Sequence, residues 1–183
     1  MNLLDKKYRI AALLLISGLA CSCIKAQETP VVDVAGGYSF FYVVKGLTLA
    51  NNGASGSVAF NANNWFGLAG DFGVYHAVPS SHIGLTAGTY AVGPRFTYRK
   101  LKRFVPFGQI LVGGGHGSEI AGGFTGVNSF VFGGGGGADI VLDSGGRFAL
   151  RPELDYFGFR ANGFTTNTIR LSIGVVFRFG KKK

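Results

Sequence analysis

The segment at residues 168–180 alternates strictly between large apolar residues and small or polar ones. A period of two residues predicts a β-strand with one apolar face. The other face carries Arg170, Arg178 and small residues, where a soluble β-protein would place its hydrophobic core. This inverted pattern is typical of a membrane-spanning strand whose apolar face meets lipid and whose polar face lines a lumen. The apolar positions are Ile169, Leu171, Ile173, Val175, Phe177 and Phe179.

The N-terminus has the features of a secretory signal. A basic segment that ends at Arg9 precedes an apolar run at residues 10–19, which is too short to cross a bilayer as a helix. We therefore expect a cleaved signal peptide at residues 1–26. The alternatives are a buried core helix or lipoprotein processing at Cys21 or Cys23. Both cysteines precede the expected cleavage site, so we expect no disulfide in the mature chain.

Composition narrows the class of the remaining chain. The sequence contains 31 Gly, 17 Phe and 7 Tyr with only 15% charged residues, and no later apolar run is long enough for a transmembrane helix. The net charge of +9 falls to about +6 without the signal peptide, and much of it lies at residues 99–103 and 181–183. Nucleic-acid binding is therefore not indicated, and solvated ends near anionic headgroups are the better interpretation.

Eight strand-like runs follow the signal, separated by clusters of Gly, Asn, Ser and Pro. The runs lie at residues 31–41, 56–63, 65–75, 86–98, 104–114, 129–142, 147–157 and 167–179. Long connections are expected at residues 42–55, 76–85, 115–128 and 158–166, and short ones at 63–64, 99–103 and 143–146. This alternation predicts an all-β fold: an eight-stranded antiparallel up-and-down transmembrane β-barrel formed by residues 27–183, with both ends in the periplasm.

Two features of the strands require an explanation. Pro94 and Pro152 fall in mid-strand, where we expect β-bulges to accommodate them. The glycine run at residues 133–137 leaves both faces of its strand bare, so large side chains of neighbouring strands must cover it. Strand five, around residues 107–112, is compatible with either facing.

Aromatic residues collect at the two ends of the strands, as in the girdles that mark a membrane interface. The expected periplasmic girdle contains Trp65, Phe66, Tyr98, Phe104, Phe148, Phe177 and Phe179. The expected outer girdle contains Phe40, Tyr42, Tyr75, Tyr90, Phe130, Phe132 and Tyr156.

The polar faces predict a charge network inside the barrel. Its members are Asp33, Asp71, Arg95, Asp139, Arg151, Glu153, Asp155, Arg170 and Arg178. An eight-stranded lumen is only wide enough to be filled by side chains, so these groups should pair with one another. Glu153 and Asp155 share one face and could perform acid–base chemistry, but a filled lumen would give a substrate no access, which favours a structural network.

The runs at residues 93–98 and 151–156 and the aromatic-ended last strand resemble the OmpA/OmpX-type eight-stranded outer-membrane β-barrel family. The resemblance covers the whole mature chain. It implies a location in the outer membrane of a Gram-negative bacterium. It also implies that Phe177 and Phe179 form the signal read by the barrel assembly machinery. The chain departs from that pattern by adding Gly180 and three lysines after the last aromatic residue.

The outer end suggests rival functions. His76, His82 and His116 fall in the expected outer connections, where solvated histidines are a better interpretation than a zinc site. His116 and Ser118, with Glu119 beside them, resemble the His-x-Ser pair of lipid A deacylases.

We expect instead a non-enzymatic barrel without a cofactor or metal, which serves envelope integrity or surface interaction through its extracellular loops. Its expected partners are outer-membrane lipids, the assembly machinery and an unknown extracellular partner, with no nucleic acid and a monomeric state. A small-solute channel is a further alternative. A soluble ligand-binding barrel is opposed by the inverted strand faces.

Overall fold

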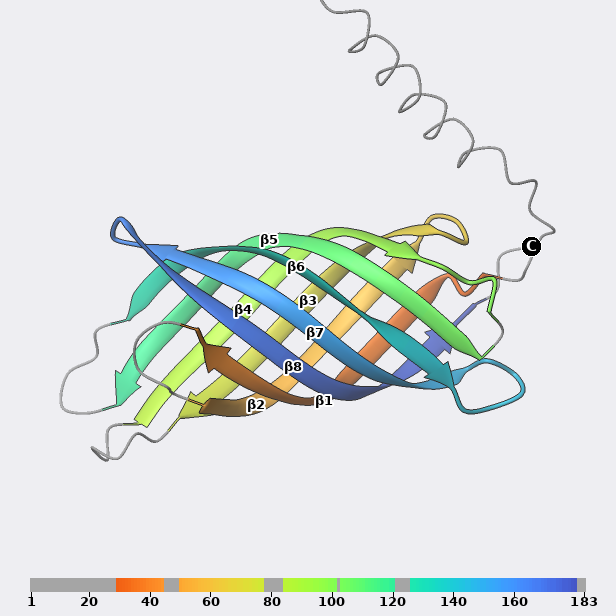
Figure 1. Cartoon of the computed structure of the whole chain (residues 1–183), viewed down its shortest axis with the longest axis horizontal. Helices are drawn as coiled ribbons and strands as arrows, with labels where there is room; N and C mark the ends of the chain where they lie inside the picture. The colour runs from red at the N-terminus through yellow and green to blue at the C-terminus, as the bar shows by residue number, and fades with distance from the viewer. Residues whose placement is uncertain (1–28, 45–49, 78–83, 102, 121–125, 181–183) are drawn as a thin grey trace, which may run out of the picture.

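The computed structural model describes residues 29–44, 50–77, 84–101, 103–120 and 126–180. The expected signal peptide and the lysine tail lie outside these residues. Eight antiparallel strands follow one another around a closed barrel, which confirms the predicted fold class (Figure 1). The strands are β1 (Val32–Val43), β2 (Ala50–Asn61), β3 (Phe66–Ala77), β4 (Gly84–Thr97), β5 (Phe104–Ile120), β6 (Val127–Val141), β7 (Phe148–Ala161) and β8 (Phe164–Phe179). The described part of the chain contains no helix that could cross a membrane.

The strands extend further toward the outer end than the sequence predicts. The long connection expected at residues 158–166 is wrong, because β7 and β8 are joined by the two-residue turn Asn162-Gly163. Both turn residues have positive φ, 48° and 82°, as a type I′ hairpin turn requires. The Asn-Gly pair is therefore a hairpin signal that lies within the segment predicted to be a long connection.

The expected bulges at the two prolines are also wrong. The β4–β5 ladder lacks the pairs of Gly93 and Pro94, but it resumes at Arg95 in the same register as before the gap. The β6–β7 ladder likewise lacks the pairs of Pro152 and Arg151 and resumes at Leu150 without a shift. A proline removes one backbone donor without inserting an extra residue, so each proline interrupts its ladder locally and leaves the strand in register.

The glycine run of β6 is covered from inside the barrel, as predicted. A Cβ atom added at Gly133 would lie 2.7 Å from Cδ1 of Phe157, and one added at Gly137 would lie 3.2 Å from Cζ of Phe107. A Cβ atom added at Gly135 would likewise clash with the Asp155 carboxylate. The bare wall of β6 therefore provides the space that large lumen side chains occupy.

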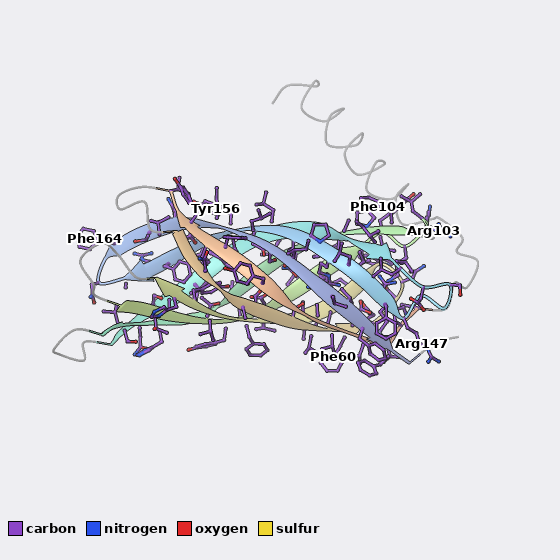
Figure 2. All side chains as sticks on the ribbon, turned by 90° about the horizontal axis from the view of Figure 1, so that it is seen from below. Phe60, Arg103, Phe104, Arg147, Tyr156 and Phe164 are labelled. Atoms are coloured by element: carbon purple, nitrogen blue, oxygen red, sulfur yellow. The ribbon has the colours of Figure 1, made fainter. Side chains whose placement is uncertain are left out.

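The outer surface of the barrel is apolar along its length. Ile173, near the middle of β8, has 52% of its surface exposed, and large exposed aromatics lie toward both ends of the strands. Figure 2 shows Phe60 and Phe104 at one end and Tyr156 toward the other. Tyr75, an expected member of the outer girdle, is instead 1% exposed and faces the lumen. Its odd position on β3 gives it the same facing as Asp71.

Candidate functional site

The lumen contains all nine residues of the predicted charge network. Each of them is buried, with at most 9% of its surface exposed. Their side chains come from β1, β3, β4, β6, β7 and β8, because alternate residues of each strand point inward. They form three successive layers between the periplasmic end and the outer end.

Arg170 is the centre of the layer nearest the outer end. Its guanidinium donates two hydrogen bonds to Asp71, at 2.7 and 2.8 Å from its Nη atoms to the carboxylate oxygens. It also donates to Asp155 at 2.6 Å from Nη2 and 3.0 Å from Nε, and lies 3.4 Å from Glu153 Oε1. Nη1 lies 3.2 Å from the Tyr75 hydroxyl. One buried arginine therefore holds three carboxylates from two strands.

The middle layer surrounds Gln109 of β5. The Gln109 amide donates to Glu153 at 2.7 Å and to Asp155 at 3.2 Å, and its carbonyl oxygen accepts from Arg95 Nη2 at 2.8 Å. The guanidinium carbons of Arg95 and Arg151 both lie over the Phe107 ring, 4.5 and 4.6 Å from its centroid. The sequence did not identify Gln109 as a lumen residue, because the pattern of strand five does not show which of its residues face the lumen.

These contacts bear on the two interpretations of Glu153 and Asp155. Both carboxylates accept hydrogen bonds from Gln109 and Arg170, and both are nearly inaccessible to solvent, at 7% and 1% exposed. A general base must be able to reach a proton on its substrate. The geometry therefore favours a structural role.

The layer nearest the periplasm contains two carboxylates and three arginines. Asp139 accepts from Arg151 at 2.6 Å and from Arg178 at 2.8 Å. Asp33 accepts from Arg99 at 3.0 Å. Arg99 belongs to the β4–β5 turn, which is expected to be solvated, yet its side chain is only 8% exposed. With Arg99 included, five arginines face five carboxylates, and the network is balanced in formal charge.

Above the charged layers the lumen is apolar, which the sequence did not predict. Phe41, Tyr75, Leu111, Val131 and Phe157 form a buried cluster at the outer end, together with Ala91. The rings of Phe41 and Tyr75 are 4.5 Å apart between centroids. The expected polar inner face is therefore found in the charged layers, and the expectation is wrong in the outer part of the lumen. The lumen is closed by an apolar layer and by ion pairs beneath it.

Two cavities accompany these layers. One, of about 20 Å³, lies in the wall region of β1, β2 and β8 beside Asp71 and Arg151, which is room for about one water molecule. The other, of about 530 Å³, opens at the periplasmic end and contains Arg147 and Arg178 in its lining.

The outer histidines have polar partners on neighbouring strands. His116 Nδ1 lies 2.8 Å from Asn128 Oδ1, and His76 Nδ1 lies 3.1 Å from Thr86 Oγ1. Ser118 shares the outward face of β5 with His116, but within the described residues the histidine contacts Asn128 through Nδ1. His82 lies outside the described residues.

The predicted assembly signal lies at the periplasmic end of β8. The Phe177 ring packs against Phe148, at 4.8 Å between centroids, and against Phe179, at 4.4 Å. Phe179 is 48% exposed on the lipid-facing side.

No family model and no curated protein matches the chain. The structure is similar to solved outer-membrane proteins at low sequence identity. Neisserial surface protein A matches with a TM-score of 0.68 and 15% identity, over 84% of this chain and 99% of that one. Ail, the attachment invasion locus protein of Yersinia pestis, matches with a TM-score of 0.59 and 18% identity, over 85% and 100%. OprG from Pseudomonas aeruginosa matches with a TM-score of 0.57 and 8% identity, over 85% and 99%.

At these identities the comparisons establish the fold. The apolar outer surface, the charged lumen and the closed strand order agree with it. The chain therefore has the eight-stranded antiparallel barrel fold found in bacterial outer-membrane proteins, which is the fold that its resemblance to the OmpA/OmpX type implied.

Proposed function

We propose that this protein is a non-enzymatic, non-conducting outer-membrane barrel that acts through the surface at its outer end, in surface interaction or envelope integrity. The observation that carries the proposal is the filled lumen. The apolar cluster of Phe41, Tyr75, Leu111, Val131 and Phe157 lies over a balanced network of ion pairs. A solute could pass only by displacing both the apolar cluster and the ion pairs beneath it. Separating an ion pair inside the barrel would leave buried charges without their partners, which is costly.

The β7–β8 hairpin illustrates what the outer end offers to a partner. Its two-residue turn is tightly paired, up to the Ala161–Phe164 pair, and Phe164 is 80% exposed at the tip (Figure 2). A rigid hairpin loses little conformational entropy when it binds, and an aromatic side chain contributes a large contact area. The outer end therefore combines a stiff support with an exposed apolar contact.

The proposal is tested by two measurements on the same protein. Purified barrel in planar bilayers should give no discrete conductance steps, with an open porin as the positive control. Lipid A isolated from cells with and without the protein should have the same mass spectrum. Regular conductance steps would replace the proposal by a channel function.

The deacylase alternative makes a separate claim about His116 and Ser118. If the serine hydroxyl were the nucleophile, lipid A would lose an acyl chain in cells with the wild-type protein and keep it with Ser118→Ala. We expect identical lipid A in wild-type, Ser118→Ala and His116→Ala cells. An acyl chain lost only when both residues are intact would overturn the non-enzymatic proposal and leave the fold unchanged.

A further inference from the structure

The cavity at the periplasmic end has a mixed apolar and cationic lining. Its inner wall contains Val105, which is 4% exposed, and the guanidinium of Arg178. Arg147, exposed in the β6–β7 turn, lines its rim. The cavity lies on the side opposite the apolar lumen cluster, at the end where Figure 2 places Phe104 and Arg147. At about 530 Å³ it is large enough for a small ligand.

Positive charge exceeds negative charge around this cavity. Arg178 bonds to Asp139 and Arg99 bonds to Asp33, so each carboxylate is already paired. Arg151 also bonds to Asp139. Among the described residues, the cavity lining itself contains three arginines, Arg99, Arg147 and Arg178, and no carboxylate. A concave surface with excess charge of one sign concentrates ligands of the other sign.

The cavity also reaches the lipid-facing side of the barrel. Phe177 and Phe179 belong to its lining, and both are aromatic residues at the periplasmic end of β8. Aromatic girdles lie at the level of the lipid headgroups, so the rim at β8 meets the depth at which phospholipid phosphates are found. Arginine guanidinium groups match the geometry of phosphate oxygens.

We propose that the periplasmic cavity binds a phosphate ester, with the phosphate at Arg147 and Arg178 and the adjoining apolar part against Val105 and Phe177. Two sources share this chemistry: the headgroup of an inner-leaflet phospholipid and a soluble phosphate of the periplasm. This cavity and the outer surface to which we assign the proposed function lie at opposite ends of the barrel. An experiment can therefore refute one of the two proposals and leave the other intact.

The test uses Arg147→Gln, because this arginine lines the rim without serving a lumen carboxylate. Arg103→Gln is the matched control, since Arg103 is an exposed arginine of a periplasmic turn outside the cavity lining. Both proteins are folded into nanodiscs, and their closed fold is checked by migration on a detergent gel with and without boiling. Inorganic phosphate is titrated by calorimetry in phosphatidylcholine discs. Native mass spectrometry then measures retention of phosphatidylglycerol from mixed discs.

We expect Arg147→Gln to weaken phosphate binding or phosphatidylglycerol retention at least fivefold, with little change for Arg103→Gln. A loss confined to the lipid measurement identifies the headgroup as the source, and a loss confined to inorganic phosphate identifies the soluble one. Equal losses in both variants would show diffuse attraction to a basic surface and overturn the proposal. Absence of binding in the wild-type protein would overturn it as well.

Discussion

The most demanding prediction about stability concerns Arg170 and the carboxylates that it binds, those of Asp71, Glu153 and Asp155. Replacing Arg170 by leucine removes the only arginine within bonding distance of Asp71 among the described residues, and it leaves Asp155 with the amide of Gln109 alone. Arg170 is 1% exposed, so solvent cannot replace the lost contacts without rearrangement. Removing one partner of a buried ion pair costs about 3–5 kcal/mol. Since two carboxylates lose their pairing at once, we expect a loss near the upper end, about 5 kcal/mol.

Arg178→Leu is the matched control. It removes a buried arginine from the same strand, but Asp139 keeps Arg151 and Asp33 keeps Arg99. The remaining loss is that of charged hydrogen bonds, about 1.5–3 kcal/mol. Urea titration of both variants in lipid vesicles, followed by tryptophan fluorescence and gel migration, gives the two free energies of unfolding. Adding Asp71→Asn to Arg170→Leu should recover part of the loss.

Equal costs for the two arginines would refute the reasoning, since it depends on whether the carboxylates keep a second arginine. A cost below about 1 kcal/mol for Arg170→Leu would refute it too, because a buried pair of this geometry would then contribute no more than an exposed one.

Three further predictions follow from other parts of the barrel. Ile173→Arg places a charge on the lipid face near mid-depth and should destabilise folding into vesicles by about 2–4 kcal/mol, while Ile173→Leu should cost little. Gly163→Ala should cost about 1 kcal/mol, because its φ of 82° disfavours a Cβ atom, and the urea midpoint measures this change. The backbone amides of Phe148 and Arg147 donate to Asp143, first at 2.7 Å and then at 3.1 Å, and lower the pKa of this exposed carboxyl. The stability that Asp143 contributes to the folded state is therefore fully present above its unfolded pKa. It is lost as the pH falls through the lower pKa of the folded state. Stability measured against pH should show a step in acid that Asp143→Asn removes, and an unchanged step would contradict the assignment.

Strand periodicity predicted most of the fold because each strand separates lipid from lumen. The same alternation placed Asp33, Asp71 and Arg170 on the inner face. It could not show which arginine pairs with which carboxylate, because partners such as Arg170 and Asp71 lie 99 residues apart in the chain.

The failures have local causes. Arg99 lies in a turn, where periodicity gives no facing, and only the structure shows its side chain reaching Asp33. The apolar outer lumen was missed because Phe41, Tyr75 and Phe157 were assigned to ends of strands or girdles rather than counted by facing. Leu111 and Gln109 were missed because their strand is apolar or glycine-rich on both faces, so alternation carries little information there.

The placement of Arg170 on the last strand has a consequence for assembly. Asp71 on β3 has its described arginine partner on β8, so its charge stays without that partner until the final strand has been added. A sheet of seven strands in the bilayer would expose two unpaired edges and a carboxylate lacking its guanidinium, and both are costly in hydrocarbon. Partly assembled forms are therefore poorly tolerated by the membrane, and closure of the β1–β8 seam should coincide with neutralisation of the interior. In this barrel the final step of insertion is also the step that makes the earlier strands compatible with lipid.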